Sequence, residues 1–245
     1  MDPSIPIGSQ DAQKQWQELH DIYKDVGFDV HLIRPVEGLP DMVFTANGFF
    51  SIDNKAVVAR YRYPQRQGET EYYIQWLKDR NFKVIDPGQI YYEGEGDTFL
   101  VGNTIFQGWG FRSDKKVVEL MKKTFPEKNG IALHLIDDRF YHLDTCFFPV
   151  NEELVYYYDK AFDTASQKAI TKAFKHAVAV SDEEALGFAL NSMTVDHTVI
   201  TNTKSKKFVN RVKSDGYQVV TAHMTEFLKS GGSVKCLTNE IWTKD

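Results

Sequence analysis

The chain has 245 residues, 42% of them apolar and 26% charged, which is ordinary for a globular protein of one large domain or two small ones. A formal net charge of -5 without a basic arm or stripe argues against nucleic acid as a partner. The sequence lacks an apolar run of about 18 residues, a signal-peptide pattern and a cysteine framework, so we expect a cytoplasmic protein that does not span a membrane.

The chain begins with a predicted helix over residues 11–26, where apolar side chains recur at helical spacing. A short apolar run at residues 28–33 predicts a strand that follows this helix.

One pattern then repeats four times between residues 41 and 220: a strand, a turn, a second strand, an amphipathic helix and a third strand. The second strands recur about every 45 to 50 residues, a spacing that indicates internal repetition. Asp114 and Asp163 are the expected N-caps of two helices, and Gly216 is the expected C-cap of another. The predicted second strands are 55–61, 104–109, 154–158 and 197–203; the helices are 69–79, 114–124, 163–174 and 206–215; the third strands are 82–85, 131–136, 176–180 and 217–222.

The two ends of the chain complete the pattern. Residues 234–242 predict an opening strand that, with the N-terminal helix and strand, makes a fifth unit. This unit lacks its second strand, which we expect to lie upstream of Met1; the alternative is a genuinely shortened unit. Five ββαβ units closing into a ring would form a five-bladed α/β propeller, with residues 1–245 as one domain and the opening strands around a central mouth. The alternative for an α/β pattern of this length is a doubly wound sheet.

A cysteine and a histidine on predicted opening strands suggest nucleophilic chemistry. Alternation along a strand would place His142 and Asp144 on one face, with Leu143 turned toward the core. Cys236 lies on the C-terminal opening strand, and a thiol near an imidazole is a minimal apparatus for attack on an electrophilic carbon. The alternative is that both are ordinary core residues.

Acidic and amide residues lie at comparable places near the opening strands: Asp41, Asn47, Glu93, Asp97 and Asp144. A ring of such groups at one mouth would bind a planar cation through charge-assisted bonds, and guanidinium is the best geometric match. The alternative is local turn chemistry, for which Asp and Asn are common.

Arg112 follows a second strand, in a loop from which it would reach a substrate carboxylate; the alternative is a solvated side chain. Cys146 and the aromatic runs 147–148 and 156–158 are predicted to be packing residues. Neither cysteine belongs to a cluster with metal-ligand spacing, and no glycine-rich nucleotide motif follows a strand, so we expect no metal and no cofactor.

Five segments of the chain together resemble the guanidine-modifying penteins, a superfamily that includes arginine deiminase, dimethylarginine dimethylaminohydrolase, amidinotransferases and arginine dihydrolases. The resemblance covers nearly the whole chain. The segments are 40–47 (PDMVFTAN), 93–97 (EGEGD), 110–113 (GFRS), 142–145 (HLDT) and 231–238 (GGSVKCLT).

The resemblance implies a role for each matching residue. Cys236 would be the nucleophile and His142 the general acid and base. Asp144 would hold the substrate nitrogens, Glu93 would orient the guanidinium, and Arg112 would bind the amino-acid carboxylate. The implied activity is hydrolysis at the guanidinium carbon of arginine or a close derivative through a covalent thiol intermediate. The alternatives are an amidinotransferase and a non-catalytic binding protein, and a homo-oligomer is compatible with the sequence.

Asn47 departs from the deiminase and dimethylargininase pattern, which has Asp at this position, and resembles the arginine dihydrolase version of the motif. An amide donates as well as accepts hydrogen bonds, so it tolerates a neutral ureido intermediate that a carboxylate would repel. The resemblance is therefore closest to the arginine dihydrolase branch, whose product is ornithine.

Overall fold

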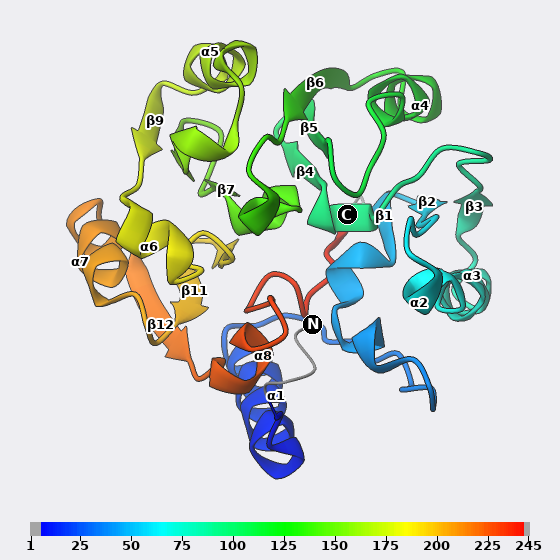
Figure 1. The fold of residues 1–245 in the computed structure, drawn as a ribbon, viewed down its shortest axis with the longest axis horizontal. Coiled ribbons are helices and arrows are strands. Elements are labelled where there is room, and N and C mark those ends of the chain that lie inside the picture. Colours follow the sequence, from blue (N-terminus) through cyan, green and yellow to red (C-terminus); the bar gives the residue numbers. More distant parts are fainter. Residues whose placement is uncertain (1–5, 243–245) are drawn as a thin grey trace.

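The computed structural model describes residues 6–242, and its outermost elements are helices. Figure 1 shows these helices at the periphery, with the strands inside them. Each long helix has a buried apolar face and an exposed polar face. The peripheral helices are α1 (Ser9–Asp25), α3 (Thr70–Lys78), α4 (Val117–Thr124), α5 (Thr164–Ala173) and α7 (Lys206–Ser214).

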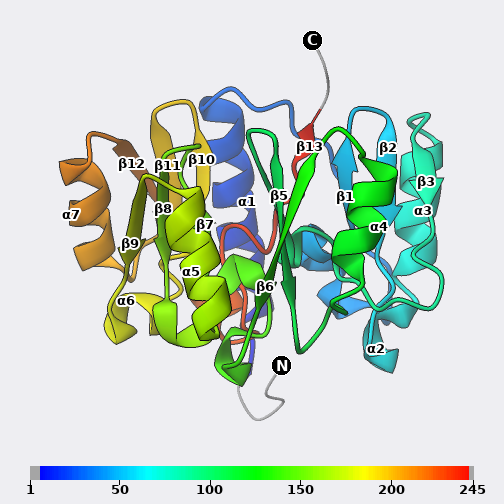
Figure 2. The ribbon, with the colours of Figure 1, turned by 90° about the horizontal axis from the view of Figure 1, so that it is seen from above.

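The strands form four sheets of one design. In each, an opening strand pairs antiparallel with a second strand, which pairs in parallel with a third strand that follows the helix. The four predicted ββαβ units are therefore present, and Figure 2 shows their strands side by side. They are β1 (Phe49–Ile52), β2 (Lys55–Val58) and β3 (Lys83–Ile85); β4 (Thr98–Val101), β5 (Thr104–Trp109) and β6 (Asn129–His134); β7 (Phe147–Pro149), β8 (Leu154–Tyr157) and β9 (His176–Ala179); β10 (Met193–Val195), β11 (Thr198–Asn202) and β12 (Gln218–Ala222).

The terminal segments differ from the prediction. Residues 28–33 form no strand, because none of the described strands pairs with them. Of residues 234–242 only β13 (Ile241–Trp242) is a strand, and it pairs in parallel with β1. The residues before β13 form turns, since the N–H of Thr238 donates to Lys235 O and the N–H of Cys236 to a side chain.

Of the three predicted helix caps, Asp163 is confirmed, Asp114 is wrong, and Gly216 lies one residue beyond the C-cap, Asp215. Asp114 does not cap α4, which begins three residues later; its carboxylate instead accepts bonds from Arg62 and from the backbone N–H of Tyr91. Asp163 caps α5 by accepting from the N–H of Ser166 at 2.8 Å. Gly216 directly follows the C-cap of α7, with a φ of 94° that glycine adopts without strain.

Three short helices lie in connections between the larger elements. They are α2 (Pro64–Gln67), α6 (Asp182–Leu186) and α8 (Thr225–Leu228).

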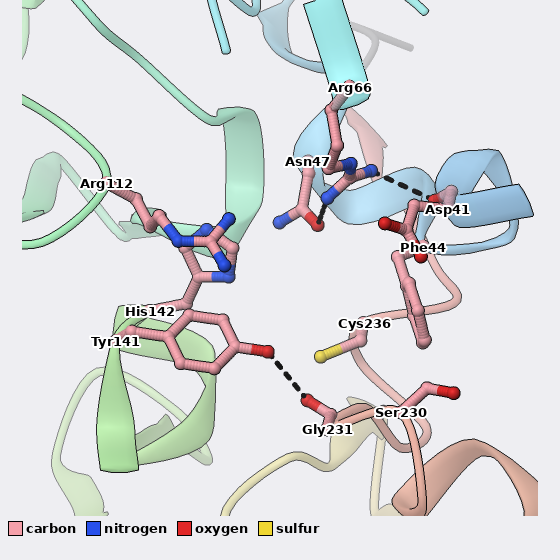
Figure 3. A pocket seen from close by; sticks show the side chains of 10 residues that line it. All are labelled: Asp41, Phe44, Asn47, Arg66, Arg112, Tyr141, His142, Ser230, Gly231 and Cys236. Atoms are coloured by element: carbon pink, nitrogen blue, oxygen red, sulfur yellow. Dashed lines mark hydrogen bonds between the residues drawn. The ribbon is translucent and has the colours of Figure 1, made fainter. Parts of the chain in front are cut away.

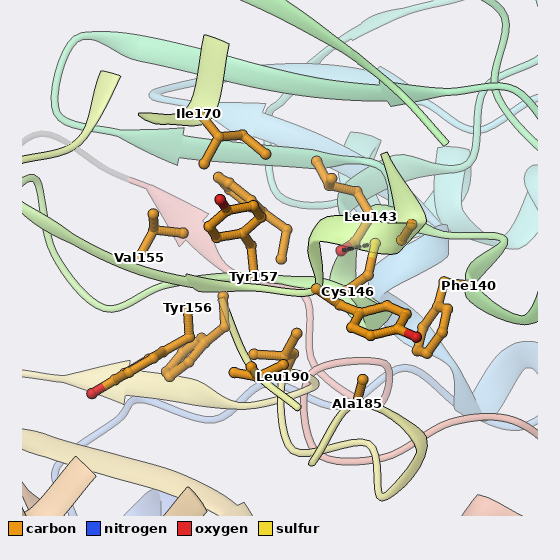
Figure 4. Close-up of a cluster of buried hydrophobic side chains, with 14 of the residues drawn as sticks. Phe140, Leu143, Cys146, Val155, Tyr156, Tyr157, Ile170, Ala185 and Leu190 are labelled. Atoms are coloured by element: carbon orange, nitrogen blue, oxygen red, sulfur yellow. Dashed lines mark hydrogen bonds between the residues drawn. The ribbon is translucent and has the colours of Figure 1, made fainter. Parts of the chain in front are cut away.

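Aromatic side chains fill the core beside β7 and β8, as predicted. Residues 147–148 and 156–158 are all buried. Cys146 is completely buried among them, with Sγ 3.6 Å from the carbonyl oxygen of Leu143, so it is a packing residue (Figure 4). No helix within residues 6–242 is long and apolar enough to cross a membrane.

Candidate active site

One pocket lies where the turns before the opening strands meet the C-terminal segment (Figure 3). Five of the eight predicted site residues line it, and the thiol of Cys236 and the imidazole of His142 are among them. Two side chains far apart in the sequence therefore share one cavity. The lining residues are Asp41, Phe44, Asn47, Arg66, Arg112, Tyr141, His142, Ser230, Gly231 and Cys236.

Short 3₁₀ helices, rather than strands, position Asp41, Asn47 and His142. They precede the opening strands and are η1 (Pro40–Val43), η2 (Thr45–Asn47), η3 (Gly94–Gly96) and η5 (Leu143–Thr145).

The predicted strand alternation around His142 is therefore wrong. His142 is the N-cap of η5, because its carbonyl oxygen accepts from both the N–H and the hydroxyl of Thr145 and closes a turn. Leu143 nevertheless packs in the core, as predicted.

Cys236 lies in a turn with two side chains on its sulfur. Sγ donates to Asp144 Oδ2 at 3.2 Å, and Asn191 Nδ2 donates to Sγ at 3.1 Å. Burial, followed by the charge of Asp144, raises the pKa of the Cys236 thiol well above its ordinary value. The sulfur of the free protein is therefore a thiol that needs a nearby cation to ionise.

His142 is anchored by Glu93. The imidazole Nε2 lies 2.8 Å from Glu93 Oε2, and Arg112 donates to the same oxygen at 3.0 Å. Burial by itself would raise the pKa of Glu93, but the hydrogen bond and charge of His142 and the charges of Arg112 and Arg66 outweigh it and hold the pKa at about 2. Because Glu93 is a carboxylate and only accepts, Nε2 carries the proton and Nδ1 is left for other partners.

Asp144 and Asp97 lie behind the pocket wall and are completely buried. Asp144 Oδ2 accepts from the thiol of Cys236, whereas Oδ1 has no partner within residues 6–242. Burial raises the pKa of Asp144 to about 7, against the hydrogen bond of Cys236. Asp97 accepts from the hydroxyl of Ser113 at 2.6 Å and from the N–H of Leu143 at 3.0 Å. Its contacts hold the loop of Arg112 and the turn of His142 in place.

Asn47 and Arg66 form a second polar wall. Arg66 Nη1 donates to Asn47 Oδ1 at 2.6 Å, Nη2 donates to the carbonyl oxygen of Asp41, and the guanidinium is paired with Glu69 at 2.8 Å. The Nδ2 of Asn47 is buried without a partner in the described part of the chain. A Cβ at Gly96 would lie 2.2 Å from this Nδ2, so the glycine is needed for the close approach.

Arg112 lies between aromatic rings at the edge of the pocket. Its guanidinium carbon is 4.7 Å from the ring centroid of Tyr63 and 4.5 Å from that of Tyr141. The hydroxyl of Tyr141 donates to the carbonyl oxygen of Gly231, which joins this wall to the C-terminal turn.

A buried ion-pair cluster forms around Lys235, the residue that precedes the nucleophile. Lys235 is 1% exposed, and its Nζ lies 2.7 Å from both Glu95 Oε2 and Glu240 Oε2. Burial by itself would lower the pKa of Lys235, but the charges of Glu240 and Glu95 outweigh it and raise the pKa. The cluster ties the turn of Cys236 to η3.

Sequence reasoning missed Arg66, Asn191 and Lys235. The available signal for Asn191 was its place before the opening strand of the fourth unit, which corresponds to the places of Asn47 and Asp144 in their units. The residues described contain no group of three or more His, Cys, Asp or Glu that could hold a metal ion.

Comparison with known proteins gives one family match. The model of the eukaryotic N,N dimethylarginine dimethylhydrolase family matches residues 2–243. The N(G),N(G)-dimethylarginine dimethylaminohydrolase of Mycobacterium tuberculosis is 37% identical over 98% of this chain and 79% of its own length.

A second kind of relative is a two-function protein. The bifunctional arginine dihydrolase/ornithine cyclodeaminase ArgZ of Synechocystis is 36% identical over 98% of this chain but only 35% of its own length. A crystal structure of the N-terminal domain of an asparagine-to-serine ArgZ variant, covalently bonded to a reaction intermediate, has 34% identity and a TM-score of 0.92. The match covers 97% of this chain and 90% of the ArgZ domain, so the two share a mixed α/β fold.

Proposed function

The chain belongs to the N,N dimethylarginine dimethylhydrolase family of pentein-type guanidine-modifying enzymes, and we propose that it hydrolyses the guanidinium group of arginine or a close derivative through Cys236. The observation that carries the proposal is that the thiol of Cys236 and the Glu93-anchored imidazole of His142 line one pocket. We assign residues 1–245 to one domain, in which the four ββαβ units and the terminal segments make a five-bladed propeller.

The charges around the pocket suit an amino acid with a guanidinium side chain. Glu93 and Asp144 are buried directly behind the pocket lining and place negative charge beside a planar cation bound in the pocket. Arg66 already donates to Glu69, Asn47 and Asp41, whereas the guanidinium of Arg112 has one hydrogen-bond partner within residues 6–242, Glu93, and is 19% exposed. Arg112 is therefore the group we assign to the substrate carboxylate.

The first step forms a thioether-like bond to carbon. The substrate cation offsets the cost of ionising Cys236 beside Asp144, and the thiol proton passes to solvent. The thiolate adds to the guanidinium carbon, and the bond from that carbon to a terminal nitrogen breaks. A doubly protonated His142 gives the departing nitrogen the proton of Nδ1, which leaves the imidazole neutral. The products of this step are a free amine or ammonia and a covalent amidino-enzyme.

The second step reverses the role of His142. The neutral imidazole removes a proton from water, the oxygen adds to the same carbon, and the carbon–sulfur bond breaks to return the thiolate. The released product carries a ureido group, which is citrulline when the substrate is arginine.

Asn47 favours continued reaction to ornithine. Its Oδ1 is occupied by Arg66, so Nδ2 is the atom offered to the substrate, and an N–H donor suits a neutral ureido oxygen better than a carboxylate does. A second round would consume another water and release the remaining terminal nitrogen as ammonia and the carbon as carbon dioxide. The relative ArgZ carries an arginine dihydrolase name, which supports this product.

Product identification tests the proposal. Wild-type protein, Cys236→Ser and the control Cys146→Ser are each incubated with arginine and with N,N-dimethylarginine, and products are identified by mass spectrometry. We expect ornithine and ammonia from arginine with the wild type and with Cys146→Ser, and no product with Cys236→Ser. Asn47→Asp should stop at citrulline. Wild-type rates from Cys236→Ser would refute the mechanism.

A further inference from the structure

Asn191, in the turn between α6 and β10, holds the nucleophile by two bonds. It is completely buried. Its Oδ1 accepts from the backbone N–H of Cys236 at 3.1 Å, and its Nδ2 donates to the sulfur of Cys236 at 3.1 Å. Nδ2 also donates to the carbonyl oxygen of Asp144 at 3.0 Å.

The orientation of this amide is determined without reference to the sulfur. A backbone N–H only donates, so the atom of Asn191 that faces the N–H of Cys236 must be the oxygen. A carbonyl oxygen only accepts, so the atom that faces the carbonyl of Asp144 must be the nitrogen. The sulfur therefore receives an N–H donor, because the backbone leaves the amide no other orientation.

Burial and Asp144 oppose ionisation of the sulfur, whereas the backbone N–H of Ser233 favours it. Asp144 Oδ2 is 3.2 Å from Sγ and, as a carboxylate, accepts the S–H but repels a thiolate. Among residues 6–242, Asn191 supplies the side-chain donor that faces Sγ. A hydrogen bond to an ionised acceptor is about twice as strong as one to a neutral acceptor, so this contact stabilises the thiolate more than the thiol.

We propose that Asn191 is a catalytic residue that stabilises the Cys236 thiolate through its N–H···S hydrogen bond. The proposal rests on the proposed function only in that Cys236 is the nucleophile. When the thiol proton leaves, Sγ gives up its donated bond to Asp144 and keeps the bond that it accepts from Asn191.

The test measures thiolate content directly and needs no turnover. The rate at which iodoacetamide alkylates Cys236 is followed at about pH 8 by mass spectrometry of the peptide that contains it, since only the thiolate reacts. Asn191→Ser is neutral but too short to reach Sγ, and Asn191→Asp keeps the acceptor for the N–H of Cys236 while removing the donor. The matched control is Asn202→Asp, because Nδ2 of Asn202 donates to the carbonyl oxygens of Gly187 and Phe188 in the same turn but does not contact the sulfur.

We expect Asn191→Ser to lower the alkylation rate at least about tenfold, which corresponds to one pKa unit for a bond to a charged acceptor. Asn191→Asp should lower it further because it adds a negative charge. Asn202→Asp should stay within about twofold of the wild type, and all proteins should react equally in urea. Circular dichroism checks folding, and Asn191→Ser carries the test if Asn191→Asp does not fold. A wild-type alkylation rate for Asn191→Ser, or an equal loss of rate in Asn202→Asp, would overturn the proposal. The alkylation rate can be measured even if the protein hydrolyses no guanidine, so failure of the proposed function and failure of this proposal are distinguishable.

Discussion

Replacing Glu93 with glutamine removes the buried carboxylate that anchors His142 and Arg112 while keeping the shape of the side chain. Glu93 is 1% exposed, and its pKa falls from an ordinary value of 4.5 to about 2. At about 1.36 kcal/mol per pKa unit, this shift corresponds to about 3 kcal/mol of stability at neutral pH. We expect the free energy of unfolding of Glu93→Gln to be lower by that amount.

The sign of the pH dependence follows from the direction of the shift. A carboxylate with a depressed pKa in the folded state contributes stability above its unfolded pKa, and that contribution is lost as pH falls from 4.5 toward 2. About 2 kcal/mol should therefore be lost between about pH 7 and about pH 3 in the wild type. Glu93→Gln lacks this group, so the difference between the two proteins should shrink on acidification.

Urea unfolding followed by tryptophan fluorescence at both pH values measures this difference. The control is Glu153→Gln, because Glu153 pairs with Lys175 at the surface, where both side chains are about two-thirds exposed, and such pairs contribute about 0–1 kcal/mol. A difference below about 1 kcal/mol for Glu93→Gln at neutral pH, or one unchanged at about pH 3, would refute the reasoning.

Two further predictions concern the turn that carries the nucleophile. Lys235→Met should lower the free energy of unfolding by about 3–5 kcal/mol in urea melts, because it leaves the buried Glu95 without its cation; a loss no larger than that of the exposed Lys175→Met would contradict this. Gly232→Ala should reduce kcat/KM more than tenfold, since a Cβ there would lie 2.3 Å from the ring of Phe44 and so displace the turn. The control is Gly8→Ala, whose added Cβ would have its nearest contact at 3.5 Å. Equal kinetics for the two variants would show that the turn adapts and would contradict this prediction.

The repeated part of the fold could be predicted because each unit carries its own periodicity. For β5 the repeated pattern predicts Thr104–Trp109, which are its bounds in the structure. The prediction failed for residues 28–33 and for most of residues 234–242, because within the described chain only Ile241 and Trp242 of these segments pair with a strand. The N–H of Cys236 bonds to the side chain of Asn191, and residues 28–33 have no strand partner within the described chain.

The site could be predicted where a residue type has few ordinary uses, as for Cys236 and His142. Asn191 could not, because an asparagine in a turn is common and its role depends on a contact 45 positions along the chain. The role of Arg66 could not be predicted for a similar reason, since only the fold brings its guanidinium to Asn47. The short 3₁₀ helices were not predicted either, because three or four residues are too few to show a period.

Rapid acid quench during turnover of arginine, followed by mass spectrometry of the digested protein, tests the central claim most directly. We predict an amidino adduct on the peptide that carries Cys236, which disappears in Cys236→Ser. Turnover without an adduct on Cys236, or an adduct on the peptide of Cys146 instead, would contradict the account.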